Sequence, residues 1–101
     1  MKFEWDEEKN QINIKKHGIS FENAIRIFSA SYYEWHDIKH SGYNPYGEWE
    51  DRYIALGWVN EVLYVCYTIR DKENAEYYRI ISARIAEKKE ADMFFRWLNG
   101  V

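Results

Sequence analysis

The chain has 101 residues and a formal net charge of −3, and its composition is 47% hydrophobic, 31% charged and 19% aromatic. This length gives room for one hydrophobic core, so we expect a single domain over residues 1–101, and the composition excludes a disordered chain. The acidic balance argues against strong nonspecific binding to nucleic acid, because such binding depends on lysine and arginine displacing counterions from phosphate.

The sequence carries no membrane or export signal that we can identify. No run approaches the roughly 18 apolar residues of a membrane-spanning helix, and the opening MKFEWDEEK is too acidic for a signal peptide. Cys66 is the single cysteine and lies in the apolar run VLYVCYTI. We therefore expect a cytoplasmic protein with a buried, unreactive thiol.

Two helices are expected at the start of the chain. Asp6 is a suitable N-cap for a helix through about Lys16, with acids in the first turn, lysines in the last and Gly18 placed to end it. Ser20 is a suitable cap for a second helix. Its apolar stripe has the i, i+3, i+4, i+7 spacing of a buried helix face and comprises Phe21, Ala24, Ile25 and Phe28.

The remainder of the chain indicates strands and one further helix. Aromatic and β-branched runs predict four strands, at about 32–38, 52–59, 62–70 and 76–84. Short connections between the last three favour an antiparallel meander. A second stripe of helical spacing predicts a helix over 87–98 and comprises Ala91, Phe94, Phe95 and Leu98. The predicted class is α+β, with two N-terminal helices, a four-stranded antiparallel sheet and a C-terminal helix.

One long irregular segment interrupts this order. Residues 39–51, KHSGYNPYGEWED, contain the only proline and two glycines, which is typical of a loop. Tyr43, Tyr46 and Trp49 in this loop suit stacking on nucleobases, but aromatic residues in long loops more often pack on one another. We expect private packing and leave stacking open as the alternative.

The common cofactor and metal motifs are absent. The sequence has no Gly-rich phosphate loop, no H-E-x-x-H and no paired cysteines, so neither a cofactor nor a structural metal is expected. His36 and His40 lie four residues apart near Asp37, but a strand end followed by a loop does not give the geometry that this spacing gives on a helix. We interpret them as surface histidines.

Arginines at the ends of neighbouring strands are the main candidates for function. Regular alternation places Arg79 and Arg84 on opposite faces of their strand, unless a bulge near Ser82 brings them together. Each arginine alone suits a salt bridge with an acid. Together with Arg70 they suit a phosphodiester site, because guanidinium groups bind phosphate oxygens at two points.

Two basic runs elsewhere in the sequence could add charge to such a site. The run KKH ends the first helix with Lys15, Lys16 and His17, and Lys88 and Lys89 follow the last strand. His17 suits either the C-terminal end of a helix, where a cation is favoured, or a role in proton transfer.

Four blocks of the sequence together resemble the BrnT family of type II toxins, in order and over most of the chain. They are FEWDEEKNQINIKKHGISFENA (3–24), DRYIALG (51–57), YVCYTIR (64–70) and RIISARIAEKKE (79–90). The resemblance implies a RelE-like ribonuclease fold, RNA cleavage that inhibits translation, and neutralisation by a BrnA-type antitoxin. The loop over 39–51 looks longer and more aromatic than the short connection usual in this family.

The resemblance also implies site residues and a mechanism. The positions carried over are Lys16, His17, Arg70, Arg79, Ser82 and Arg84. With RNA as the implied substrate, the residues that we expect to contact it are Lys15, Ser82, Lys88 and Lys89. The expected reaction is attack of an RNA 2′-hydroxyl on its adjacent phosphate, without a metal, with His17 or Lys16 as the base and the arginines stabilising the phosphorane. The general acid is not assigned.

Two other classes of function remain open from the sequence. A noncatalytic RNA-binding module would use the same cations to hold phosphate without cleaving it. A protein-binding module would use the aromatic loop or an exposed sheet edge to hold a partner.

Overall fold

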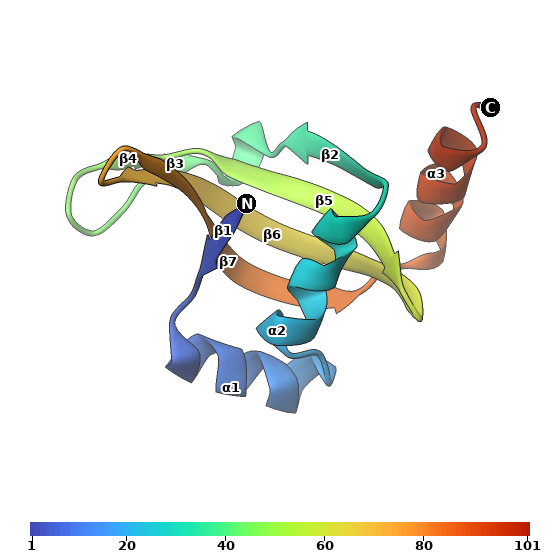
Figure 1. Ribbon diagram of the computed structural model, residues 1–101, viewed down its shortest axis with the longest axis horizontal. Helices are drawn as coiled ribbons and strands as arrows, with labels where there is room; N and C mark the ends of the chain where they lie inside the picture. The colour runs from blue at the N-terminus through green and yellow to red at the C-terminus, as the bar shows by residue number, and fades with distance from the viewer.

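The computed structural model describes residues 1–101 and confirms the α+β class (Figure 1). In chain order the elements are β1 (Lys2–Glu4), α1 (Glu7–His17), α2 (Phe21–Ala24), the 3₁₀ helix η1 (Ile25–Ser29), β2 (Tyr32–His36), the 3₁₀ helix η2 (Ile38–His40), β3 (Gly42–Tyr43), β4 (Trp49–Glu50), β5 (Arg52–Val59), β6 (Glu61–Lys72), β7 (Ala75–Ile85) and α3 (Lys88–Leu98). None of the helices combines the length and the apolar character that a membrane crossing requires.

The main sheet has five strands in the order β1-β7-β6-β5-β2, so the prediction of four antiparallel strands is wrong in one respect. The four predicted strands do pair antiparallel, but β1 adds a parallel edge to β7, with Lys2 opposite Tyr77. Three residues are too few to show the alternation that marks a strand, and the partner lies at the other end of the chain. The β3-β4 pair within the predicted loop was missed because each of its strands has only two residues.

The first predicted helix is confirmed, with both of its signals. The Asp6 carboxylate accepts from the Lys9 amide at 3.2 Å, and Gly18 adopts the left-handed conformation with φ of 72° and donates to the Ile14 carbonyl. Lys15, Lys16 and His17 lie in the last turn, as expected for cations at a helix C-terminus.

The second predicted helix is shorter than expected. Ser20 caps it, but α2 has only four residues and continues as η1 for five more. The segment IRIFS contains β-branched and aromatic residues, which favour an α-helix weakly, and 3₁₀ turns are frequent at helix ends. The tighter turn places Ala24 and Ile27, three residues apart, in the core.

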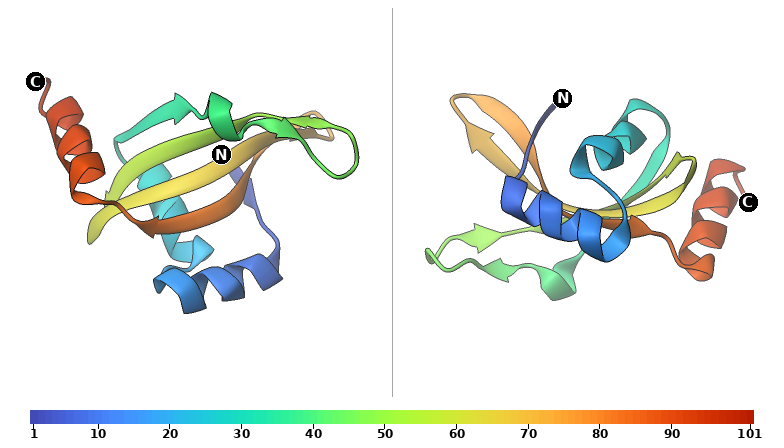
Figure 2. Two further views of the ribbon diagram at one scale, coloured as in Figure 1. Left: turned by 180° about the vertical axis from the view of Figure 1, so that it is seen from behind. Right: turned by 90° about the horizontal axis from the view of Figure 1, so that it is seen from below.

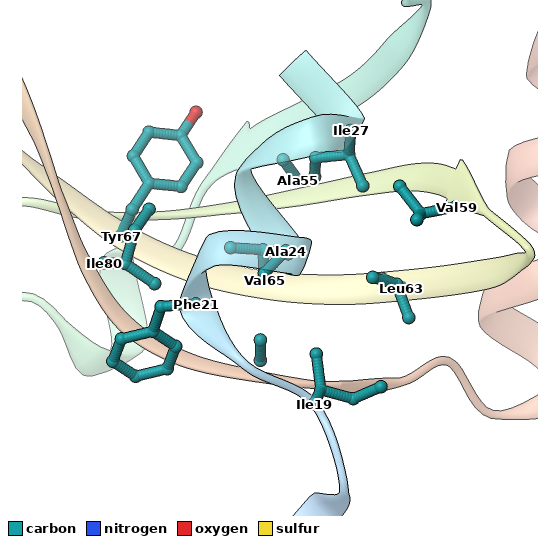
Figure 3. Close-up of a cluster of buried hydrophobic side chains, with 11 residues drawn as sticks. Ile19, Phe21, Ala24, Ile27, Ala55, Val59, Leu63, Val65, Tyr67 and Ile80 are labelled. Carbon is teal, nitrogen blue, oxygen red and sulfur yellow. The ribbon is translucent and has the colours of Figure 1, made fainter. Parts of the chain in front are cut away.

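The main core lies between α2–η1 and one face of the sheet, as Figure 3 shows for Ile27 above Ala55 and for Phe21 near Ile80. The opposite face of the sheet is covered at one end by α3, which packs through Phe94 onto Leu56, and toward the other end by the β3-β4 pair. Figure 2 shows α2 and the β3-β4 pair on opposite sides of the sheet, with α3 at the far end from β3-β4.

Helix α1 closes the edge of β7 beyond the end of β1. The buried side chain of Asn13 bonds the backbone of Ala83 in both directions. Its Nδ2 donates to the Ala83 carbonyl at 2.7 Å, and its Oδ1 accepts from the Ala83 amide at 3.2 Å. Along the sheet, the first turn of α1 is the one nearer to β3-β4 and its last turn is the one nearer to α3 (Figure 1).

Candidate active site

A bulge in β7 brings the two arginines of this strand to one face. Cys66 pairs with Ser82 and Tyr67 pairs with Ile80, so Ile81 has no partner on β6. The extra residue changes the alternation, and both Arg79 and Arg84 share a face with the even-numbered residues of β6. The sequence left this bulge open as one of two alternatives, and the structure adopts it.

This face of the sheet and the β3–β4 arm, residues 42–50, enclose a pocket of about 360 Å³, which we call the basic pocket. Its charged and aromatic lining includes Lys9, Arg52, Arg70, Arg79, Tyr43 and Tyr46. The sheet supplies three of these cations from neighbouring strands, because Arg52 and Arg79 both pair with Thr68 from either side of β6. Helix α1 supplies Lys9 from its first turn.

The β3–β4 arm is tied to the sheet and ordered at its tip. The Thr68 hydroxyl donates to the Asp51 carbonyl at 2.7 Å, and the Asn44 side-chain oxygen accepts from the amides of Tyr46 and Glu48, each at 2.9 Å. Tyr43 packs edge-on against Trp49 with 5.2 Å between ring centroids. The expected private packing is thus present for this pair, but Tyr46 takes no part in it and is 87% exposed.

The cations of the basic pocket are only partly neutralised within the chain. Arg70 donates to Glu50 at 2.8 Å, whereas the nearest carboxylate oxygen to Arg79 belongs to Glu4, 3.9 Å away. Arg52 and Lys9 form no ion pair. The pocket therefore keeps a positive charge that suits an anionic ligand such as a phosphodiester.

Glu50 and His40 are the carboxylate and the imidazole that line the basic pocket, and groups of these two types serve as general bases and acids in enzymes. The hydrogen bond from Arg70 holds the pKa of Glu50 below its usual value, so this carboxylate is ionised at neutral pH. Nδ1 of His40 donates to the Asp37 carboxylate at 2.8 Å, because an ionised carboxylate accepts only, and this leaves Nε2 without a hydrogen-bond partner.

The sequence analysis did not single out Lys9, Glu50 or Arg52, and it set His40 aside as a surface histidine. Arg52 was detectable, since alternation along two adjacent strands aligns it with Thr68 and hence with Arg70. Lys9, His40 and Glu50 reach the pocket because of how α1, η2 and the arm pack against the sheet, and no local sequence pattern predicts this packing.

Arg84 lies on the same face as Arg79 but outside the basic pocket. Its guanidinium donates to both carboxylate oxygens of Glu90, at 2.8 and 2.9 Å, and stacks over the Tyr64 ring at 3.8 Å. The pKa of Glu90 is lowered by this hydrogen bond. These contacts fasten the start of α3 to the sheet.

The remaining predicted residues also lie outside the basic pocket and line no other pocket. They are Lys15, Lys16, His17, Ser82, Lys88 and Lys89. The first three lie in the last turn of α1, and Lys88 pairs with Asp92 at 2.8 Å on the surface of α3. Ser82 lies between Arg79 and Arg84 on the shared face.

Cys66 is buried, as the sequence predicts, and burial raises the pKa of its thiol to about 11. At neutral pH the thiol is protonated and is not a nucleophile. The structure contains no group of three or more His, Cys, Asp or Glu side chains placed to hold a metal ion.

Comparison with known families identifies most of the chain. Residues 5–90 match the family described as "Ribonuclease toxin, BrnT, of type II toxin-antitoxin system". A search of curated proteins found no match. The matched region contains the whole main sheet except β1, and it contains every side chain of the basic pocket named above.

Proposed function

The chain belongs to the BrnT family of ribonuclease toxins of type II toxin-antitoxin systems, and from this premise we propose that it cleaves RNA at the basic pocket without a metal ion. The observation that carries the proposal is the grouping of four cations around a single carboxylate, Glu50, in this pocket. Fixed cations stabilise the charge that grows on a phosphate during transfer, and an ionised carboxylate removes a proton.

In the proposed reaction the 2′-hydroxyl oxygen of one nucleotide attacks its own 3′-phosphorus. Glu50 takes the hydroxyl proton as the new P–O bond forms. The P–O5′ bond then breaks, and His40 donates a proton to the leaving 5′-oxygen. The products are a 2′,3′-cyclic phosphate and a free 5′-hydroxyl.

The arginines have separate parts in this proposal. Arg70 and Arg79 bind the nonbridging phosphate oxygens and stabilise the phosphorane, and Arg52 adds charge to the same site. Arg70 also positions Glu50, whose carboxylate lies 2.8 Å from it. Arg84 has no catalytic part in this proposal and holds α3 on the sheet, because Glu90 occupies its guanidinium outside the pocket.

The base proposed here differs from the one that the resemblance implied. Neither His17 nor Lys16 lines the basic pocket, so we place the base at a residue that does. Glu50 is ionised and already adjoins the arginine that would hold the phosphate. We propose that Lys15, Lys16 and His17 contact RNA outside the basic pocket and take no part in catalysis.

Purified protein tests this function directly. RNA incubated with the protein and EDTA should be cut into fragments with 2′,3′-cyclic phosphate and 5′-hydroxyl ends. Substitution of every 2′-hydroxyl by 2′-O-methyl should abolish cleavage, because the nucleophile is then blocked. RNA that is bound but left intact would instead select the noncatalytic alternative.

A type II toxin family implies an antitoxin partner, and we propose that this partner is a BrnA-type antitoxin. We also propose that residues 1–101 form a single toxin domain, which the antitoxin binds. The gene next to that of the toxin should encode a short DNA-binding protein. Coexpression of the two should relieve growth arrest and yield a complex on affinity purification.

A further inference from the structure

Tyr46 is an exposed aromatic residue without an aromatic partner. Tyr46 is 87% exposed and lines the basic pocket, and its ring forms no aromatic pair, whereas Tyr43 packs on Trp49. Its position is nevertheless ordered, because its amide donates to the Asn44 side chain at 2.9 Å. The turn therefore holds the Tyr46 ring in the lining of the pocket, where the ring is available to stack on a ligand.

The opposite wall of the pocket carries the positive charge. Arg52, Arg70 and Arg79 project from three adjacent strands, whereas Tyr43 and Tyr46 come from the arm. An aromatic platform facing a row of cations is the arrangement that binds single-stranded nucleic acid, because bases stack on the rings and phosphates contact the cations. The volume of about 360 Å³ falls within the range of pockets that bind small organic ligands.

A second pocket of about 340 Å³ adjoins the first and shares Arg70 and Glu50 with it. Its own charged residues are mainly acidic and include Glu48, Asp51 and Asp71. The acidic residues of this second pocket disfavour phosphate. An RNA strand therefore gains its phosphate contacts in the basic pocket, which contains Tyr46, and not in the second pocket, which contains Trp49.

We propose that the substrate is single-stranded RNA, with one nucleobase stacked on Tyr46 while the adjoining phosphate contacts Arg70 and Arg79. This inference rests on the proposed function, since it names the substrate class of the same site. Bases within a duplex are stacked on each other and do not present a free face to Tyr46. Double-stranded RNA therefore has phosphates for the arginines but no base for the arm.

Binding of a 2′-O-methyl oligonucleotide measures this contact apart from cleavage. Fluorescence anisotropy with a labelled single strand of about eight nucleotides should show Tyr46→Ala weakening binding by roughly 5- to 150-fold, the range expected for loss of one stacked base. Tyr46→Phe keeps the ring and should bind like the unchanged protein. The same strand annealed to its complement should bind more weakly and should be insensitive to Tyr46→Ala.

Trp58→Ala is the matched control, because Trp58 is also an exposed aromatic residue but lies outside both pockets. It should leave binding unchanged. The inference is overturned if Tyr46→Ala binds the single strand as tightly as the unchanged protein, if the duplex binds equally well, or if the unchanged protein binds neither.

Cleavage of the matching unmodified RNA, measured in parallel, separates the two proposals. Single-strand binding that depends on Tyr46 without any cleavage would sink the catalytic proposal and leave the stacking site standing. Cleavage that is unaffected by Tyr46→Ala would do the reverse.

Discussion

Arg79 and Arg84 project from the same face of β7, although an odd number of positions separates them, because Ile81 is bulged out of the pairing with β6. The shared face does not give them a shared site. Arg79 lines the basic pocket with Arg70, whereas Arg84 is held by Glu90 at the start of α3. The sequence suggested that Arg70, Arg79 and Arg84 meet at one phosphate. In the structure Arg70 and Arg79 line the pocket together with Arg52, and Arg84 does not.

Substitution of the arginines should separate catalysis from stability. Arg70→Ala and Arg79→Ala should each lower kcat/KM for RNA cleavage by about 10²- to 10³-fold, as expected for loss of one group that stabilises developing charge. Their melting temperatures should stay close to that of the unchanged protein. Arg84→Ala should instead keep its activity at temperatures where it is folded and lose about 1–2 kcal/mol of stability, because two hydrogen bonds to a half-buried carboxylate are removed.

Glu50→Gln should lower kcat by about 10²- to 10⁴-fold, the range for loss of a positioned base. Binding of a 2′-O-methyl strand should be unchanged or tighter, because the neutral amide no longer competes with phosphate for Arg70. His40→Asn should lower kcat without this gain in binding. A Glu50→Gln protein that cleaves at the normal rate would remove the carboxylate from the mechanism.

The Arg84–Glu90 pair should make stability depend on pH in the acidic range. The pKa of Glu90 is lowered in the folded protein from an ordinary value of 4.5, so the folded state favours the ionised carboxylate. Its contribution is present above pH 4.5 and is lost as the pH falls through the folded pKa. Urea titrations at pH 7 and pH 3 should show Glu90→Gln less stable than the unchanged protein at the higher pH, with the difference shrinking at the lower one.

Asn13 should be among the polar residues on which stability depends most. Its buried amide bonds the carbonyls of Ile19 and Ala83 and the Ala83 amide, so Asn13→Ala should cost about 2–3 kcal/mol by leaving these groups unpaired. Asn13→Asp should cost more, because a carboxylate cannot donate to the two carbonyls. Gln11→Ala, on the exposed side of the same helix, is the control and should change the melting temperature little.

Gly57→Ala tests the close packing of η1 on β5. A Cβ atom at this position would lie 2.5 Å from the Cβ of Ile27 and 3.4 Å from its Cα, so the helix backbone would have to move. We expect a loss of about 1–3 kcal/mol in chemical denaturation, as for other overpacked cores. Gly42→Ala meets open space and should be nearly neutral, and equal losses in the two variants would show that the contact with Ile27 does not matter.

The parts of the fold that follow from local signals were predictable. Asp6 and Ser20 cap helices as expected, strand β5 begins and ends where its aromatic and β-branched run does, and the buried Phe94 lies in the expected helical stripe. Such features depend on residues within a few positions of one another, so the sequence reports them directly.

The site was predictable only in part. Arg70 was found because it ends a well-marked strand, but Lys9 and Glu50 reach the same pocket from a helix and from an arm whose two-residue strands show no period. Arg84 was grouped with the others because its ion pair with Glu90 depends on how α3 turns back onto the sheet.

The sequence by itself determined the α+β class, the meander and the family, because capping, periodicity and short connections are local and the four blocks that resemble the family run in order along the chain. The tertiary structure decided the parallel pairing of β1, the bulge at Ile81 and the residues that meet at the basic pocket. Each of these is set by contacts between segments distant in sequence, whose packing and charge balance no single stretch of residues encodes.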